Sequence, residues 1–192
     1  MPVRRVLLGG GGSAPVNLAL ERIGFDLVGR YGANAVAETA VAGRTDWTND
    51  ANATGVRNGS SAGFAGDALG ARGGQLELDY ADPVGKDSLV ISSARLLFYV
   101  QVAGTLLDNA DVQLRYAIGG GAFVTAATIT GDVNALTVPR VVDLTALATS
   151  WPLVASVRAA VRADAGLGET WTAALDAVEL EVIASRVVTT GL

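Results

Sequence analysis

The chain lacks histidine and cysteine altogether, and Lys86 is the only lysine among its 192 residues. Without cysteine the protein can form no disulfide, no thiolate zinc site and no cysteine nucleophile. Without histidine it also lacks the commonest general base and the commonest metal ligand. We therefore predict that the protein is not an enzyme, that it has no catalytic residue, cofactor or metal, and that it acts by binding.

Charges and long apolar runs are scarce as well. Charged residues make up 17% of the chain, the formal net charge is −5, and the arginines are scattered singly apart from Arg4 and Arg5. Nucleic-acid binding is driven mainly by neutralisation of phosphates, which this charge balance does not favour. The longest uncharged runs fall short of the ~18–20 apolar residues that span a membrane. The sequence therefore predicts neither nucleic acid nor a membrane as a partner.

Half of the residues are hydrophobic, which is enough for a packed core in one domain. From Gly74 onward, apolar and polar side chains alternate in segment after segment. This period of two is typical of strands with one buried and one solvated face. The alternating apolar positions are Leu76, Leu78 and Tyr80; Leu96, Phe98, Val100 and Val102; Val112, Leu114, Tyr116 and Ile118; Val157 and Val161; and Val178, Leu180 and Val182.

Turn residues separate these segments and leave little room for helices. The glycine run Gly119–Ala122 predicts a hairpin turn, and "ADPVGKDS" and "DAGLGET" predict further breaks. Only "DLTALATSWPLVAS" looks helical, and Pro152 keeps that helix short. Six or seven strands without long intervening helices predict an all-β fold, an antiparallel β-sandwich or a barrel.

The glycines near the N-terminus suggest one different fold. Gly9, Gly11 and Ala14 follow the apolar segment Val3–Leu8 with the spacing of a dinucleotide-binding fingerprint. That fingerprint belongs to a series of alternating strands and helices, and no such series follows here. We therefore interpret these glycines as a flexible joint between an apolar arm and the sandwich.

The half of the chain from Ser92 to Ser185 contains elements in a characteristic order. They are the strand "ARLLFYVQV", the Gly-rich hairpin "DVQLRYAIGGGAFVTAATIT", the strand end "VPRVVDLT", the Trp-containing helix and Arg-bearing strand "SWPLVASVRAAVRADAG", and the closing strand "LDAVELEVIAS". This order resembles a jelly-roll-like module of virion proteins of tailed bacteriophages. The resemblance implies a jelly-roll-like β-sandwich over residues 36–185, with an N-terminal arm (1–35), one short helix and a C-terminal tail (186–192).

The same resemblance implies a structural protein of the virion, assembled in the cytoplasm of a bacterial host. A single domain without coiled coils or repeats favours a capsid-decorating or head-associated role over a fibre. The expected partners are the major capsid protein or another virion protein, together with further copies of the chain in a homo-oligomer. The alternative is a carbohydrate-binding tail or fibre module that binds a glycan during host adsorption. A glycan-cleaving enzyme is a third alternative.

The apolar residues of the arm are the first predicted partner contacts. Val3, Val6, Leu7 and Leu8 form a cluster that a free arm would leave in water. Unanchored termini are normally poorly ordered, so we expect a partner or a neighbouring subunit to cover these side chains.

A long polar segment, Arg44–Gly74, is the second predicted contact region. It is rich in Asn, Asp, Ser and Gly and has no periodicity, and loops of this length are usually functional or held by a partner. We expect Trp47 to be exposed there, and Trp47 and Phe64 to contact the partner. Trp151 and Trp171 are expected to pack under the edges of the sandwich instead.

Acidic and amide side chains in this segment could supply oxygen ligands to calcium. Their spacing is not that of an EF-hand, however, and Asp and Asn are ordinary turn residues, so we expect turns. The side chains in question are Asp46, Asn49, Asp50, Asn52 and Asp67.

Three further motifs also have ordinary explanations. Ser61 lies in a Gly-x-Ser-x-Gly pattern, but a nucleophile elbow needs a preceding strand, a following helix and a histidine. Asn52 and Asn58 begin glycosylation sequons, which we interpret as chance matches. Glu179 and Glu181 share a strand face and could form a glycosidase pair, but a solvated strand face is the expected explanation.

Overall fold

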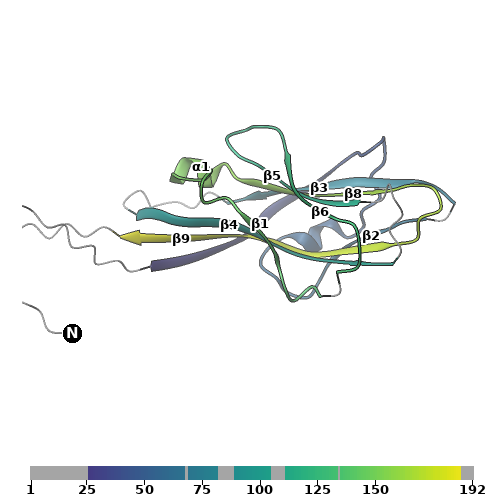
Figure 1. Cartoon of the computed structure of the whole chain (residues 1–192), viewed down its shortest axis with the longest axis horizontal. Coiled ribbons are helices and arrows are strands. Elements are labelled where there is room, and N and C mark those ends of the chain that lie inside the picture. The colour runs from purple at the N-terminus through teal and green to yellow at the C-terminus, as the bar shows by residue number, and fades with distance from the viewer. Residues whose placement is uncertain (1–25, 68, 82–88, 105–110, 134, 187–192) are drawn as a thin grey trace, which may run out of the picture.

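The computed structural model describes residues 26–67, 69–81, 89–104, 111–133 and 135–186. These residues form nine β-strands, one 3₁₀ helix and one short α-helix (Figure 1). In chain order the elements are β1 (Asp26–Thr39), η1 (Asp50–Ala53), β2 (Ala62–Ala65), β3 (Arg72–Tyr80), β4 (Leu89–Ala103), β5 (Asp111–Ala117), β6 (Val124–Ile129), β7 (Arg140–Asp143), α1 (Trp151–Ala155), β8 (Arg158–Ala165) and β9 (Thr172–Arg186).

The strands form two layers, which we define as sheets A and B (Figure 1). Sheet A has the order β7–β4–β9, and the first half of β1 and the short β2 both lie along the far side of β9. Sheet B has the order β6–β5–β8–β3, followed by the second half of β1. All of these strand pairs are antiparallel. The fold is therefore an all-β, jelly-roll-like antiparallel sandwich, as the alternating pattern predicts.

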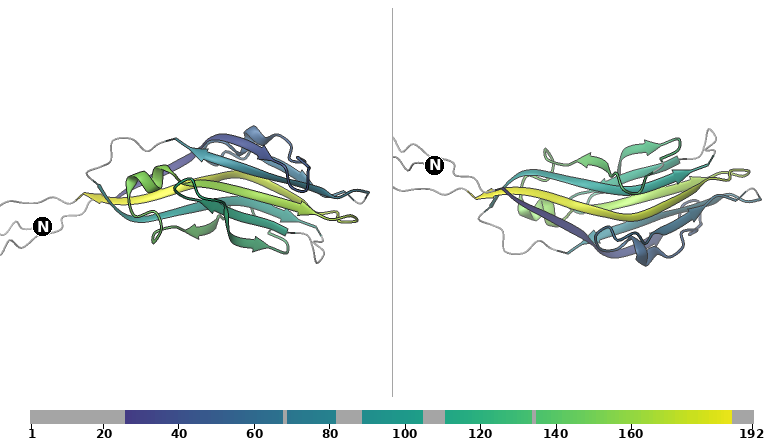
Figure 2. Two further views of the ribbon diagram at one scale, coloured as in Figure 1. Left: turned by 90° about the horizontal axis from the view of Figure 1, so that it is seen from above. Right: turned by 90° about the horizontal axis from the view of Figure 1, so that it is seen from below.

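Strand β1 belongs to both sheets and closes one side of the sandwich. Its residues up to Gly32 pair with β9, and its residues from Ala33 pair with β3. A Cβ on Gly32 would lie only 2.1 Å from the carbonyl carbon of Gly55, whose N–H donates a 2.7 Å hydrogen bond to the Ala33 carbonyl. Only glycine permits this close approach. Because β1 joins the sheets on one side, β6 and β7 are the edge strands on the other (Figure 2).

The core lies between the inner faces of the two sheets, and the predicted alternation identifies most of it. Nearly all of the alternating apolar side chains are buried, whereas Tyr116 and Ile118 at the end of β5 are only partly buried. The largest fully buried side chains are Trp171, Phe98, Leu76, Leu78, Leu96, Leu114, Leu144, Leu175 and Leu180.

The predicted turn and helix are also confirmed. Gly119 and Gly120 have positive φ angles of 65° and 74° in the β5–β6 hairpin, a conformation that favours glycine. Helix α1 is only five residues long, with Pro152 in its first turn. The indole of Trp151, the first residue of α1, donates a 2.8 Å hydrogen bond to the Leu89 carbonyl. No helix in the described ranges is long and apolar enough to cross a membrane.

Two boundaries differ from the sequence-based prediction. The sandwich begins at Asp26 rather than near residue 36, because residues 26–32 form a regular ladder with β9. The segment Arg44–Gly74 is not one irregular loop: it contains η1, β2 and the start of β3. Its polar sequence is no obstacle to order, because its backbone pairs with strands that are distant in the sequence. The arm residues Val3, Val6, Leu7 and Leu8 lie outside the described residues.

Candidate functional site

The two aromatic residues predicted as exposed contacts lie in the core instead. Trp47 is 5% exposed and Phe64 is 2% exposed. The Phe64 ring lies between the two tryptophans, with its centroid 5.5 Å from that of Trp47 and 5.0 Å from that of Trp171. The expectation that Trp47 is exposed is therefore wrong, and neither Trp47 nor Phe64 offers a partner its side chain in this conformation. The expected burial of Trp171 is confirmed.

Hydrogen bonds hold Trp47 in this position. Its backbone N–H donates to Glu38 Oε1 at 2.9 Å, and its indole Nε1 donates to the Gly74 carbonyl at 3.2 Å. A Cβ on Gly74 would lie 2.7 Å from Cδ1 of the indole, so glycine is needed at this edge of the ring. Burial raises the pKa of Glu38 even though the Trp47 N–H acts against that shift. The aromatic cluster of Trp47, Phe64 and Trp171 is thus a structural support for the strands around it.

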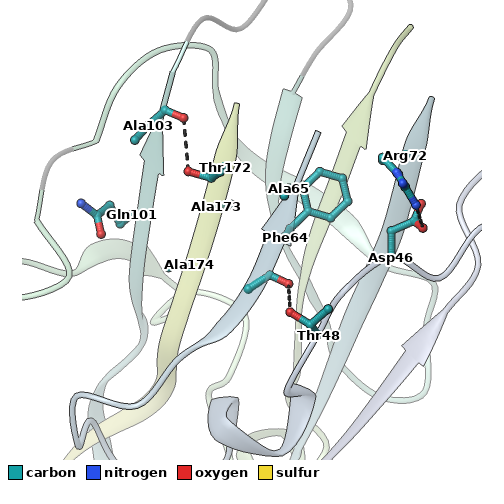
Figure 3. A pocket seen from close by; sticks show the side chains of 11 residues that line it. Asp46, Thr48, Phe64, Ala65, Arg72, Gln101, Ala103, Thr172, Ala173 and Ala174 are labelled. Atoms are coloured by element: carbon teal, nitrogen blue, oxygen red, sulfur yellow. Dashed lines mark hydrogen bonds and ion pairs between the residues drawn. The ribbon is translucent and has the colours of Figure 1, made fainter. Parts of the chain in front are cut away.

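A groove of about 560 Å³ lies beside this cluster, and Phe64 is the member of the cluster that lines it (Figure 3). It crosses the ends of β4, β9 and β2, where small side chains leave a depression in the surface of the sheet. Gln101 and Thr172 lie on one side of the groove, and the Asp46–Arg72 ion pair lies on the other (Figure 3). The small residues that line it are Gly63, Ala65, Ala103, Ala173 and Ala174.

The charged side of the groove is a network around one arginine. Arg72 binds Asp46 Oδ1 at 3.1 Å and Asp67 Oδ2 at 2.8 Å, and Asp46 Oδ2 accepts the Gly73 N–H at 2.9 Å. Hydrogen bonds from the Leu69 N–H and from Arg72 lower the pKa of Asp67. The structure therefore brings together two of the three aspartates considered for calcium, but around a guanidinium.

The remaining calcium candidates have local roles in turns. Asn49 has a left-handed backbone conformation (φ 57°) just before η1, which begins at Asp50. Asn52 Nδ2 donates to the Ser61 carbonyl at 3.1 Å. Within the described ranges, no three acidic side chains are arranged to hold a metal ion. Asn49 and Asp50 thus lie at the start of the η1 turn, whereas Asn52 connects η1 to the residue before β2.

The nucleophile-elbow pattern around Ser61 does not have the required surroundings. The strand β2 follows Ser61 rather than preceding it, and the next element after β2 is the strand β3 rather than a helix. Asn58 Oδ1 accepts the Ser60 N–H at 2.8 Å, which makes this segment a tight polar turn. Ser61 is therefore a residue that leads into a strand.

A line of buried carboxylates on β9 is the feature that sequence patterning missed. Asp176, Glu179 and Glu181 lie on the outer face of sheet A, where a solvated face was expected, yet each is at most 4% exposed. Asp176 accepts the backbone N–H groups of Asn58 and Gly59, and Glu179 accepts that of Arg57. The expectation of a solvated face is therefore wrong. The segment before β2, more than 100 residues away in sequence, covers Asp176 and Glu179, whereas arginines of the neighbouring strands bind Glu181.

Glu181 is tied to two arginines from the neighbouring strands. Arg95 Nε donates to its Oε1 at 2.6 Å, and Arg30 Nε donates to its Oε2 at 2.8 Å. Burial raises the pKa of Glu181, but the two arginine hydrogen bonds outweigh burial and hold the pKa below its ordinary value. Both oxygens are therefore engaged, and Glu179 and Glu181 do not form the free acid–base pair that glycoside hydrolysis needs.

The polar groups that line the groove are an amide, a guanidinium, a carboxylate and two hydroxyl groups. The guanidinium, the carboxylate and the hydroxyls already make hydrogen bonds within the protein, and the Gln101 amide is the further polar group at the groove. Among the described residues, however, no Trp, Tyr or Phe is fully exposed to provide a flat stacking platform. A ligand in the groove would therefore be held by polar contacts rather than by ring stacking.

No family model matches the chain, and no curated protein matches it. Solved structures with a partial likeness include the following two. TmCBM61, solved in complex with β-1,4-galactotriose, is 12% identical, with 80% of this chain and 86% of that chain covered and a TM-score of 0.40. A family two carbohydrate esterase from Cellvibrio japonicus is 12% identical, with 88% of this chain but only 37% of the esterase covered and a TM-score of 0.30. At TM-scores this low, neither likeness carries an argument about function.

Proposed function

We propose that the chain is a non-enzymatic structural protein of a tailed-phage particle, in a capsid-decorating or head-associated role. The observation that carries the proposal is the pairing of Asp26 with Ser185 at one end of the sandwich. Residues 1–25 and 187–192 both join the body at that end, so the apolar arm can anchor one end of the sandwich. The groove lies at the other end of β9, roughly 40 Å away along an extended strand. This geometry suits a module that is attached to the particle at the Asp26 end and projects the groove at its other end.

The side chains also suit binding better than catalysis. The buried carboxylates of β9 accept hydrogen bonds from backbone N–H groups and arginines. Their one oxygen without a hydrogen-bond partner, Glu179 Oε2, is buried 3.8 Å from the Arg30 guanidinium. General acid–base chemistry needs a titratable group that can exchange protons with a substrate. A rigid antiparallel sandwich offers broad faces for contact with neighbouring subunits instead.

Purified particles from cells that carry the gene test this proposal. We expect the protein to co-purify with particles in stoichiometric amount, and antibody-gold labelling to mark the heads. Labelling of tails or fibres would favour the second candidate below. Absence of the protein from washed particles would overturn the virion proposal.

A glycan-binding tail or fibre module is the second candidate, and the groove is the observation that favours it. Planar polar groups such as the Gln101 amide and the Arg72 guanidinium can donate hydrogen bonds to sugar hydroxyls. A glycan array probed with the full chain and with Gln101→Ala tests this candidate. Binding that Gln101→Ala weakens would support it, and Gln113→Ala, which alters a glutamine on sheet B, is the matched control.

A further inference from the structure

We propose that the protein self-associates by antiparallel pairing of strand β6 with β6 of a second copy. The pairing would extend sheet B across a two-fold axis. The proposal does not depend on a virion or glycan role, because β6 lies at the open side of the sandwich and contributes nothing to the groove of β2, β4 and β9.

Strand β6 has an open hydrogen-bonding edge. Among the described residues it pairs only with β5, so alternate backbone N–H and C=O groups point away from the sheet. Its first five residues are all exposed, and only Ile129 at its end is buried. The segment 124–130 reads "VTAATIT": it is uncharged, has no proline and is rich in β-branched residues, which favour strand pairing.

The other edge strand on this side is protected, whereas β6 is not. Strand β7 has four residues, with a charge at each end (Arg140 and Asp143) and Pro139 directly before it. Short length, charged residues and proline are the usual features that keep an edge strand from pairing with another chain. The one feature of β6 that could hinder such pairing is a register shift, which leaves Ala126 without a partner on β5.

A second copy is the occupant that this edge fits best. A two-fold pair of identical strands is self-complementary, and an uncharged strand meets no repulsion from its own copy. The inner side of β6 is also accessible, because a groove of about 310 Å³ lies between β6 and Arg140. One strand pair buries less than the ~800 Å² per partner of a standard interface, so we expect a weak and reversible dimer.

Analytical ultracentrifugation over a range of concentrations tests the proposal with the full chain. We expect the mass to rise from 19.5 kDa towards twice that value. Val124→Lys should weaken association at least about tenfold, which corresponds to about 1.4 kcal/mol. Val141→Lys on β7 is the matched control, because the two valines are equally exposed (53% and 54%) on the two edge strands. Both variants should keep the wild-type melting temperature.

Cysteine scanning adds a test that depends on strand order. The chain contains no cysteine, so Thr125→Cys, Ala126→Cys, Ala127→Cys and Thr128→Cys each introduce one thiol. In a two-fold antiparallel pair, only the position nearest the axis faces its own copy, so one or two adjacent variants should form disulfide dimers much faster than the rest.

Three results of the two experiments above would overturn the proposal. They are a wild-type chain that stays monomeric at all concentrations, equal effects of the Val124 and Val141 substitutions, and uniform cross-linking along β6. If deletion of residues 2–12 abolished a dimer that Val124→Lys left intact, the arm rather than β6 would be the interface.

Discussion

Arg95 on β4 donates a 2.6 Å hydrogen bond from Nε to Glu181 on β9, across the outer face of sheet A. The carboxylate is almost fully buried although it lies on the outside of the sandwich, because Arg30 binds its other oxygen. Together these residues connect β4, β9 and the first half of β1.

We expect Glu181→Ala to lower the free energy of unfolding by about 1–3 kcal/mol, since it leaves two arginines without their shared acceptor. Denaturant unfolding measures the change. Asp164→Ala, which removes the partly exposed Arg162–Asp164 pair, is the control and should cost less than about 1 kcal/mol. Equal effects of the two substitutions would contradict the structural role of Glu181.

Stability should be nearly constant between about pH 6 and 8, because the chain has no histidine. The pKa of Glu181 is lowered in the folded state, so its contribution is present above the unfolded value of about 4.3 and is lost as the pH falls through the folded value. Melting temperatures across the acid range measure this loss, which Glu181→Gln should reduce. A shift of many degrees between pH 6 and 8 would contradict the prediction.

A second loss of stability is expected on the alkaline side. Burial raises the pKa of both Tyr80 and Tyr99, and the nearby Glu179 raises it further. Their contribution is therefore present below the unfolded value of about 10 and is lost as the pH rises through the folded values. Tyr80→Phe should reduce the alkaline slope while it removes the 3.0 Å hydrogen bond to the Val178 carbonyl.

Replacement of Phe64 by alanine should unfold the aromatic cluster rather than only weaken a partner contact. Deleting a buried phenylalanine ring costs about 3–5 kcal/mol, and here it leaves Trp47 and Trp171 without the ring between them. Thermal unfolding followed by tryptophan fluorescence measures the effect. Leu69→Ala, at a residue that is 90% exposed, should change stability by no more than about 0.5 kcal/mol.

Gly32→Ala should destabilise the fold where β1 changes sheets. The new Cβ would meet the Gly55 backbone, which cannot move away as a flexible side chain could. Overpacking of this kind typically costs 1–3 kcal/mol, or more where backbone is involved. Gly131→Ala is the control, because nothing lies within 4 Å of a Cβ built there and its φ is not positive. A Gly32→Ala variant as stable as the control would contradict this account of β1.

If the chain attaches to a phage particle as we propose, deletion of residues 2–12 should abolish that attachment while the sandwich keeps its melting temperature, since β1 begins only at Asp26. Co-sedimentation with particles measures attachment. Replacing Val6, Leu7 and Leu8 by serine is the control for chain length and should have the same effect. Normal attachment of both variants would refute a role for the arm.

Much of the fold could be predicted from the sequence because burial in a sheet repeats every two residues. The inward positions of β3, β4, β8 and β9 follow from that alternation, and the hairpin follows from Gly119 and Gly120. The candidate site could not be predicted in the same way. The groove joins Gln101 on β4, Thr172 on β9 and Arg72 on β3, and no local motif links positions so far apart.

By itself, the sequence determined the all-β class, the core faces of the strands and the lack of histidine and cysteine chemistry, since each depends on composition or on a local period. The tertiary structure decided which side chains on the outer faces of the sheets are shielded from solvent. Glu179 is buried because the backbone of Arg57, 122 residues away, covers it, and Trp47 is held in the core because β3 brings the Gly74 carbonyl to its indole N–H. Alternation tells which way a side chain points from its own sheet. What covers that side chain depends on segments that only folding brings together.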